Sequence, residues 1–582
     1  MTVLDVTDYG ARPGSRENAI PCVAKAVAAC RGRGNATLVF PRGRYDFWAE
    51  SPATVGIELR GLEGVTLDGD GSEFVCHGRM APIAVSECRH MKLMNFVIDW
   101  DRPLTSQAVV EAVDDEHLDI IIDPQAYPYV IEDGKLRFVG EGWKSAVVHY
   151  CLFDKTQLEI VPLTRDGALG DIFDGQAEAL SPGRVRLHGR VPYKPDIGTY
   201  LALYGQREMA GITLSENLDT VLENIRIHYA PGGGVLSFMC DGLYFNAVNV
   251  EARAGKGRVF SALADAFYFP NCRGLVRIEN CAHTGQTDDW ANFRGTYTMV
   301  IAVQPPNRVE VKVKWGGRGY YHAGDEICFV DVKTMQRGSP CRVVEVKDLE
   351  SGYMLLTCEG ALPGDAGPAF VVENLTWHPE VEVRNCTISR RHRARGILIS
   401  TPRRAVIENN IFRTAGAAIL IDGDTDVWYE AGAVRDLTIR GNIFENCCSS
   451  AEPGGWQKWG EAVICITPTH YPSDVNTEPY HQNIRIEGNT FRHYDYSLLY
   501  ARSVRRLAFR NNRIERTTAY PMHGRPVNFL LDGCREVDIS GNVVDESFPG
   551  RNCELQHMRP SDVRVGEDQH LSVSVAERDA AT

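Results

Sequence analysis

The chain has 582 residues, of which 44% are hydrophobic and 24% are charged, a composition typical of globular proteins. No apolar run approaches the ~18 residues of a membrane span. The formal net charge of -14 disfavours nucleic acid or an anionic membrane surface as a partner. The first residues lack the basic and apolar regions of a signal peptide, so we expect either that the protein is not exported or that a leader has been removed.

The 17 cysteines are odd in number and include no CxxC pair. Most of them stand inside apolar, strand-like stretches, where cysteine behaves as a small hydrophobic residue. The close Cys and His spacing of a structural zinc site is missing from the sequence. We therefore expect buried free thiols and no metal.

The first predicted element is a helix from Asn18 to Cys30, which carries Ile20, Val23 and Val27 at helical spacing. Short β-rich runs follow it, beginning with TLVFPRGRYDF. A solenoid needs a cap over the apolar end of its first coil, and this helix is suited to that place.

An asparagine-containing phrase returns along the chain from about Thr220 onward, with an apolar residue on each side of it. Its asparagines are Asn224, Asn280, Asn385, Asn410, Asn442, Asn489, Asn512 and Asn542. The shortest spacings fall within the ~20–45 residues of one solenoid repeat. Asparagine tolerates a left-handed backbone at a corner and can form a ladder with its equivalents in the coils above and below. The phrase therefore predicts a parallel β-helix.

Two stretches lack this phrase and alternate between apolar and polar residues, as antiparallel strands do. We predict an all-β fold: a right-handed parallel β-helix with two inserted antiparallel β-barrel-like modules and a short N-terminal helical cap. The predicted parts are the cap and first coils (1–103), the first inserted module (104–201), the coils with the candidate catalytic residues (202–304), the second inserted module (305–371), the C-terminal coils (372–550) and a C-terminal tail (551–582).

Three aspartates are candidates for catalysis. Asp265 lies about one coil before the pair Asp288 and Asp289. One turn of a β-helix later the chain returns at a strand spacing of ~4.8 Å, so the three carboxyl groups can share one face if a turn at Gly285 aims the pair. Crowding raises the pKa of at least one of them. Hydrolysis of a glycosidic bond needs such an acid together with a base.

Six further residues are candidates for substrate binding. Trp290 directly follows the pair and would present an aromatic face to a sugar, although a tryptophan at such a place is more often in the core. Asn292 and Arg294 could bond sugar hydroxyls. Trp428 and Glu430 stand in a later coil that could line the same cleft. His392 is the sixth, although a satisfied surface histidine is the commoner reading.

The motifs resemble known families. DVTDYGA, the short helix and ATLVFPRGRYDFW are similar to the entry segment of pectate-lyase-like β-helix proteins, and the aspartate triad resembles that of the family 28 polygalacturonases. The whole chain most resembles glycoside hydrolase family 110, the inverting α-1,3-galactosidases that act on blood group B antigen and related glycans. LADAFYFPNCRG, GQTDDWANFRG and DTDVWYEAGAVRDLTIRGNIF carry this likeness.

The resemblance implies an exo-acting enzyme without a cofactor that releases terminal α-1,3-linked galactose from a glycan. It places the catalytic roles on Asp265, Asp288 and Asp289. By analogy with polygalacturonases, Asp288 would be the general acid and the other two would hold the water. It also implies a secreted or periplasmic location. A homodimer is a further expectation, because solenoids with protruding inserts often pair.

Two alternatives stay open. One is a polygalacturonase-like hydrolase acting on an acidic polysaccharide, although few lysines surround the aspartate pair. The other is a non-catalytic glycan-binding β-helix resembling a viral tail fibre, which would not need three carboxylates in register. A calcium-assisted lyase is expected less, because it needs a cationic base and several metal carboxylates together.

Overall fold

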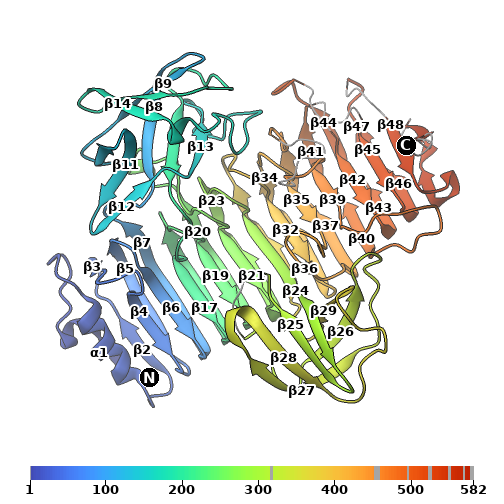
Figure 1. Ribbon diagram of the computed structural model, residues 1–582, viewed down its shortest axis with the longest axis horizontal. Coiled ribbons are helices and arrows are strands. Elements are labelled where there is room, and N and C mark those ends of the chain that lie inside the picture. The colour runs from blue at the N-terminus through green and yellow to red at the C-terminus, as the bar shows by residue number, and fades with distance from the viewer. Residues whose placement is uncertain are drawn as a thin grey trace.

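The computed structural model describes residues 2–314, 319–450, 459–494, 497–521, 527–547, 552–567 and 571–576. Its main body is a solenoid of parallel β-strands that runs the length of the molecule (Figure 1). Each coil contributes a strand to as many as three faces, which confirms the predicted parallel β-helix. The first face contains β1 (Thr2–Asp5), β2 (Ala36–Val39), β5 (Thr66–His77), β7 (Arg89–Trp100), β18 (Leu218–Ile227), β20 (Asp241–Glu251), β22 (Arg273–Glu279), β30 (Glu380–Arg384), β33 (Arg404–Glu408), β37 (Asp436–Arg440), β40 (His481–Glu487), β43 (Val504–Arg510), β46 (Arg535–Ser540) and β49 (Val563–Val565).

The second and third faces complete the coils. The second face contains β3 (Arg44–Trp48), β23 (Ala282–Thr284), β31 (Thr387–Ile388), β34 (Ile411–Phe412), β38 (Ile443–Glu445), β41 (Thr490–His493), β44 (Arg513–Arg516) and β47 (Val543–Val544). The third face contains β4 (Val55–Arg60), β6 (Ala81–Ser86), β17 (Ile212–Ser215), β19 (Val235–Phe238), β21 (Phe267–Pro270), β24 (Ala291–Gln304), β32 (Ile397–Ser400), β35 (Ile419–Ile421), β39 (Ile464–Ile466), β42 (Leu499–Arg502), β45 (Phe529–Asp532), β48 (Asn552–Gln556) and β50 (Ser572–Val575).

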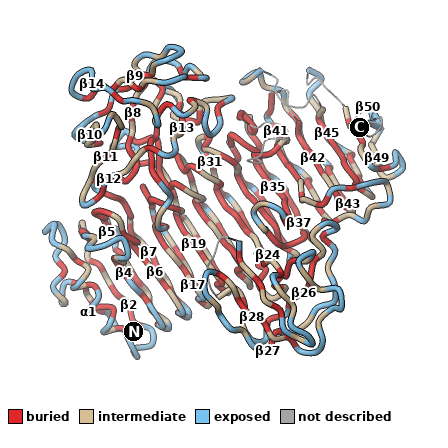
Figure 2. Tube along the Cα trace, in the orientation of Figure 1, coloured by how far each residue is buried: buried red, intermediate tan, exposed pale blue. Residues whose placement is uncertain are grey.

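The hydrophobic core lies inside the solenoid, where buried residues follow its whole length (Figure 2). Equivalent positions of successive coils stack directly on each other. Phe412, Phe444 and Phe491 form such a column, with ring centroids 5.3 and 4.8 Å apart. Parallel strands in register thus turn one repeated residue into a continuous apolar column.

The asparagine phrase covers two consecutive positions at a corner of the coil, and these two positions have different roles. The ladder position is held by five buried asparagines, which confirms the predicted ladder at Asn410, Asn442 and Asn512. Each donates its Nδ2 to the Oδ1 of the next at 3.0 Å, in the order Asn410, Asn442, Asn489, Asn512 and Asn542. The preceding position has a left-handed backbone and holds Asn409, Asn511 or a glycine. Asn224, Asn280 and Asn385 occupy this second kind of position and lie outside the buried ladder. Asn224 still donates its Nδ2 to the equivalent Asn95 of the neighbouring coil at 2.8 Å, as predicted, and Asn280 donates to Asn246 at 2.9 Å.

The N-terminal cap is the helix α1 (Ile20–Cys30), which matches the prediction within two residues. Val23 and Val27 are buried against the first coil. Within the described residues, no helix is long and apolar enough to cross a membrane.

The first inserted module is antiparallel. Its six-stranded sheet has the order β13 (His149–Phe153), β16 (Tyr200–Tyr204), β8 (Ser106–Val113), β9 (His117–Ile122), β15 (Arg184–His188) and β14 (Gln176–Ser181). A three-stranded sheet of β10 (Tyr129–Glu132), β11 (Lys135–Gly140) and β12 (Trp143–Ala146) packs beside it. Figure 1 shows the module above the solenoid, near its N-terminal end.

The second inserted module is a small closed barrel. It consists of the outer half of β24 together with β25 (Arg308–Lys312), β28 (Tyr353–Cys358), β27 (Cys341–Asp348), β26 (Glu326–Asp331) and β29 (Phe370–Asn374), each antiparallel to the next. It has its own apolar core around Val311, Phe329 and Leu356. Because β24 belongs both to the third face and to this barrel, the barrel is rigidly joined to the solenoid (Figure 1).

Two other sequence expectations concern the C-terminus and the cysteines. The predicted tail is wrong in its described part, since β48, β49 and β50 pair in parallel with the preceding coils and continue the solenoid. All 17 cysteines lie in the described residues and are free thiols, 15 of them buried. This confirms their reading as small apolar side chains.

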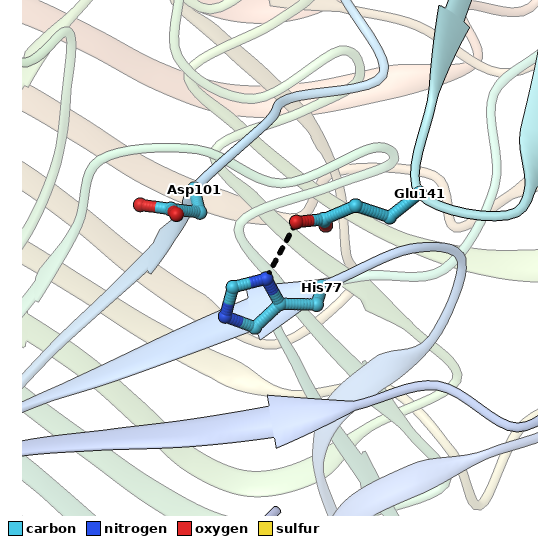
Figure 3. A group of neighbouring side chains, drawn as sticks. All are labelled: His77, Asp101 and Glu141. Carbon is cyan, nitrogen blue, oxygen red and sulfur yellow. Dashed lines mark hydrogen bonds and ion pairs between the residues drawn. The ribbon is translucent and has the colours of Figure 1, made fainter. Parts of the chain in front are cut away.

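The first module is held to the first coils through a buried histidine. His77, at the end of β5, contacts Asp46 Oδ1 through Nε2 and Glu141 Oε1 through Nδ1, both at 2.8 Å. Figure 3 shows Glu141 reaching His77 from the module, with Asp101 beside them. Trp48 stacks on the imidazole ring at 3.7 Å. One ring nitrogen of His77 thus bonds the module and the other bonds the first coils. His77 therefore joins the module to the solenoid as a docking contact.

The ladder predicts a difference between two neighbouring asparagines. Asn512→Ala removes the acceptor for Asn489 and the donor to Asn542, and leaves buried polar groups without partners. We expect the free energy of unfolding to fall by at least ~1–3 kcal/mol. Asn511→Gly is the control and should be nearly neutral, because glycine holds the same position at Gly441, Gly488 and Gly541. Chemical and thermal denaturation compare them, and equal losses would refute the division of roles.

The docking contact predicts a pH dependence of stability. Burial lowers the pKa of His77, but the hydrogen bonds to Glu141 and Asp46 outweigh it and raise the pKa above its ordinary value. The charged form therefore stabilises the fold below the unfolded pKa of ~6.5, and this stabilisation is lost as the pH rises through the folded pKa. Thermal melts of the wild type should show this loss, and those of His77→Gln should not. His90→Gln, at an exposed position, should retain the wild-type slope.

Candidate active site

The three candidate aspartates meet at the corner where the chain enters the third face. Phe267 of β21 pairs with Ala291 of β24, which in turn pairs with Ile397 of β32. Two residues before each of these stand Asp265, Asp289 and Arg395, so the register of the sheet places them in three successive coils. The Ala266 amide donates to the Asp289 carbonyl at 3.0 Å, which continues the pairing into the corner. In-register stacking therefore positions this part of the site.

A turn before β24 aims Asp288 at the same point, as the sequence analysis required. Gly285 has a φ of +75°, and a Cβ there would lie 2.6 Å from the Val259 carbonyl oxygen. One carboxylate oxygen from each of Asp265, Asp288 and Asp289 lies within 4.8 Å of the others. The three predicted residues thus form one cluster.

Arginines compensate the charge of this cluster. Asp288 Oδ2 lies 2.5 Å from an Nη of Arg207, and its Oδ1 lies 3.1 Å from an Nη of Arg393. Asp289 accepts hydrogen bonds from the backbone and Nε of Arg395 at 3.0 and 2.8 Å. Within the described residues, Asp265 has no arginine at ion-pair distance. The same guanidinium groups supply the positive charge that a metal ion would otherwise bring to three carboxylates.

This arrangement separates the proton affinities of the three groups. Burial and the neighbouring charges of Asp288 and Asp289 raise the pKa of Asp265 well above its ordinary value. Burial also acts on Asp288, but Arg207, Arg393 and Arg395 outweigh it and lower the pKa of that carboxyl. Burial and Asp288 raise the pKa of Asp289, although Arg395 opposes this. Of the three carboxyl groups, Asp265 therefore has the pKa that is raised most clearly in the free protein, whereas the resemblance to polygalacturonases names Asp288 as the acid.

A cavity of about 940 Å³ opens above the aspartates. Residues of the first module, such as His149 and Phe173, line one part of it, and Tyr320 of the second module lines another. Trp428 and Trp459 come from later coils. Both inserted modules are therefore walls of the same cavity.

Four of the predicted binding residues lie in this cavity. Asn292 and Arg294 project from β24, Glu430 lies on the short strand β36 (Glu430–Ala431) that pairs with β24, and Trp428 is 40% exposed. Arg294 Nε lies 3.5 Å from Glu430 Oε1. Burial raises the pKa of Glu430 to about 7, against the effect of Arg294. Arg294 and Glu430 thus form a largely buried part of the cavity wall that offers hydrogen-bonding groups.

Two predicted binding residues lie elsewhere. Trp290 is 1% exposed and packs in the solenoid core against His283 and Phe412, so its predicted contact with a sugar is wrong. Alternation alone would place Trp290 on the same face as Asn292, two residues later. Trp290 precedes the first residue of β24, and the corner at that point turns it into the core instead. His392 is fully buried, and its Nδ1 contacts the Arg393 carbonyl oxygen at 2.7 Å. It is therefore neither a surface histidine nor a cavity residue, and burial lowers its pKa to about 4.

Sequence analysis missed several residues of the site, and three of them show why. Arg207 follows the first module directly, Asp166 lies in a loop of that module, and Tyr268 of β21 accepts a hydrogen bond from Arg294. No motif marks the first two, because only the docking of the module brings them to the aspartates. Tyr268 could have been found, since the alternation that turns Phe267 and Phe269 into the core turns Tyr268 outward.

The fold and the site together define a class. Clustered carboxylates of unequal proton affinity at the base of a large cavity fit the acid and base that a glycoside hydrolase needs. Two segments match known domain models: residues 106–201 match GLAA-B beta-barrel domain I, and residues 317–371 match GLAA-B beta-barrel domain II.

Relatives match over almost the whole chain. Alpha-1,3-galactosidase B of Bacteroides thetaiotaomicron is 38% identical, over 97% of this chain and 95% of that protein. Alpha-1,3-galactosidase A of Bacteroides fragilis is 32% identical, over 96% and 95%. The chain belongs to the family of these α-1,3-galactosidases and is a glycoside hydrolase, which confirms the resemblance found in its sequence.

Solved structures are more distant. The A-module of a mannuronan C-5 epimerase of Azotobacter vinelandii is 12% identical with a TM-score of 0.40, over 98% of both chains. A family 28 exopolygalacturonase of Yersinia enterocolitica is 11% identical with a TM-score of 0.35, over 99% of this chain and 78% of that one. At these scores the neighbours add nothing to the fold, which follows from the three parallel sheets.

Proposed function

We propose that the protein is an exo-acting, inverting α-1,3-galactosidase that removes terminal galactose from glycans such as blood group B antigen. The observation that carries the proposal is the cluster of Asp265, Asp288 and Asp289 at the base of a walled cavity, in a member of this family. The names of the relatives supply the linkage and the sugar.

The walls support exo action. An enzyme that cleaves inside a polysaccharide needs an open groove along the solenoid. Here the first module and the barrel of the second module both line the cavity, and Trp428 stands on a third side. Asn292, Arg294 and Glu430 offer hydrogen-bonding groups for the hydroxyls of one terminal sugar. Asn292 Oδ1 and Arg294 Nε are buried without a hydrogen-bond partner, so a bound hydroxyl would satisfy them.

In the proposed reaction Asp288 protonates the glycosidic oxygen as the bond to the anomeric carbon breaks. Asp265 and Asp289 hold a water molecule, remove its proton as its oxygen attacks that carbon, and leave galactose with inverted configuration. A proton that the raised pKa of Asp265 keeps on that carboxyl has to reach Asp288, across a distance of at most 4.8 Å. The three groups thus titrate as one unit that holds a shared proton.

Inversion is proposed on the family resemblance, against one geometric indication. Inverting enzymes commonly place acid and base ~6.5–9.5 Å apart, and retaining enzymes about 5–5.5 Å. The closest oxygens of the trio lie within 4.8 Å. A water held between two carboxylates, with the acid as the third group, is a different geometry from the two-carboxylate pair on which this rule rests. The product anomer is therefore part of the test below.

The charges of the cavity disfavour the alternative substrate, an acidic polysaccharide. Arg207, Arg393 and Arg395 pair with the catalytic aspartates, and Arg294 lies beside Glu430. A uronate would have to compete with these carboxylates for the guanidinium groups. A neutral sugar has no such cost. Export to the periplasm or medium and pairing into a homodimer stay predictions of the sequence.

Substrate choice tests the proposal directly. The protein should hydrolyse an α-1,3-galactoside and reject the matched α-1,3-glucoside, because a misplaced 4-hydroxyl leaves buried polar groups unpaired. NMR of the early product should show β-galactose first. Comparable rates on the two sugars, or internal cleavage of polygalacturonate, would contradict the galactosidase assignment, and early α-galactose would contradict inversion.

The role of the acid is tested by leaving-group dependence. Asp288→Asn should lower the rate on a natural disaccharide by at least ~10²–10⁴-fold, the usual contribution of general acid catalysis. The loss should be much smaller on an aryl galactoside with an acidic phenol, whose departure needs little protonation. Asp265→Asn is the matched variant and should lose activity on both substrates. If Asp265→Asn instead shows the leaving-group dependence, the acid is Asp265, whose pKa is raised most clearly in the free protein.

A further inference from the structure

The cavity extends from the catalytic aspartates in two directions. Along β24 the chain passes Asn292, Arg294 and Thr296 at about 3.3 Å per residue and moves away from the corner. At the corner itself, residues of the first module reach the aspartates. Figure 1 shows the first module above the third sheet and the barrel of the second module below it, which agrees with this division.

The two directions differ in exposure. On the β24 side, Asn292 is 6% and Glu430 7% exposed, and the unpartnered Asn292 Oδ1 lies there. On the module side, Val148 is 48% exposed, and His149 and Asp171 are also open to solvent. A terminal sugar fits the enclosed side, and a glycan that continues into solvent has to leave by the open side.

The ion pairs of Asp288 give the same orientation independently. The general acid has to lie beside the leaving oxygen, because it protonates that atom. Of the three aspartates, Asp288 is the one connected to the module: it pairs with Arg207, which follows the last strand of the module, and with Arg393. Arg393 in turn donates from Nε to Asp166 of the module at 2.7 Å. The leaving group therefore lies on the side of the first module.

We propose that the first inserted module forms the binding site for the leaving group, and that this site takes at least two neutral sugar units next to the galactose. The inference rests on the proposed function and adds to it the part of the substrate that the module recognises. A volume of about 940 Å³ lies near the upper end of the ~300–1,000 Å³ typical of ligand pockets, which is more than one galactose unit needs.

The chemistry of the module's wall fits neutral sugars. Phe173 and Tyr150 form an aromatic pair with ring centroids 5.4 Å apart, and both line the cavity. An aromatic face packs against the apolar C–H face of a sugar ring. Asp171 and Asp174 stand exposed on the same wall and can accept hydrogen bonds from hydroxyls. Their negative charge disfavours a sialylated or uronate-containing leaving group.

The experiment compares three substrates that differ only in the leaving group: an aryl α-galactoside, an α-1,3-linked digalactoside, and a trisaccharide that extends the digalactoside by one neutral sugar. We measure kcat/KM for the wild type, Phe173→Ala and His149→Ala. The two variants should lose about tenfold more kcat/KM on the trisaccharide than on the aryl galactoside, equivalent to ~1.4 kcal/mol of differential binding. Leu180→Ala, an exposed apolar residue of the same module outside the cavity, should retain the wild-type ratio.

The outcomes separate the two proposals. If the wild type hydrolyses none of the three substrates, the proposed function fails and the leaving-group site fails with it. If the wild type is active and the variants lose the same factor on all three substrates, or lose nothing, the module does not bind the leaving group. His149→Ala keeps the test valid if Phe173→Ala does not fold, because His149 is exposed and the thermal melt of its variant should match the wild type.

Discussion

The stacking of parallel coils in register is the constraint on which the site depends. It brings Asp265 and Asp289 to equivalent positions of adjacent coils, one strand spacing apart, and adds Arg395 in the next coil. Like charges at this spacing repel strongly in a partly dry cavity. The fold therefore creates an electrostatic conflict that the rest of the site has to resolve.

Residues from segments far apart in the sequence compensate this repulsion between the aspartates. Arg395 is part of the solenoid itself, whereas Arg207 is carried by the exit of the first module, and Asp166 of that module orients Arg393. The module thus does more than cover the cavity, since its docking sets the charge of Asp288. The His77 contact with Glu141 holds the same module to the first coils, so a structural contact at one end supports the electrostatics at the other.

The solenoid and the aspartate cluster could be predicted from sequence because both arise from local repetition. The repetition alone does not distinguish the roles of neighbouring residues. Asn409 and Asn410 are neighbours in one phrase, yet one supplies a left-handed backbone and the other a buried ladder, and only the backbone separates them. Trp290 was misplaced because the alternation of β24 begins at a turn whose phase the sequence does not reveal. Arg207 and Asp166 were beyond reach, because long-range docking leaves no local pattern.

The different pKa shifts of the three carboxyl groups have a consequence for catalysis. The raised pKa of Asp265 favours its protonated form, but Asp265 is proposed to hold the water rather than to donate the proton. The pKa of Asp288, which is proposed to lie next to the leaving group, is lowered because Arg207 and Arg393 outweigh its burial. A bound glycan excludes water from the cavity and strengthens every charge interaction there, including the repulsion between Asp288 and Asp289. Moving the shared proton from Asp265 to Asp288 replaces this repulsion by that between Asp265 and Asp289, and it leaves Asp265 ionised as a base. Because Arg207 and Arg393 favour the ionised form of Asp288, the contacts of the bound glycan have to supply the free energy of this proton transfer.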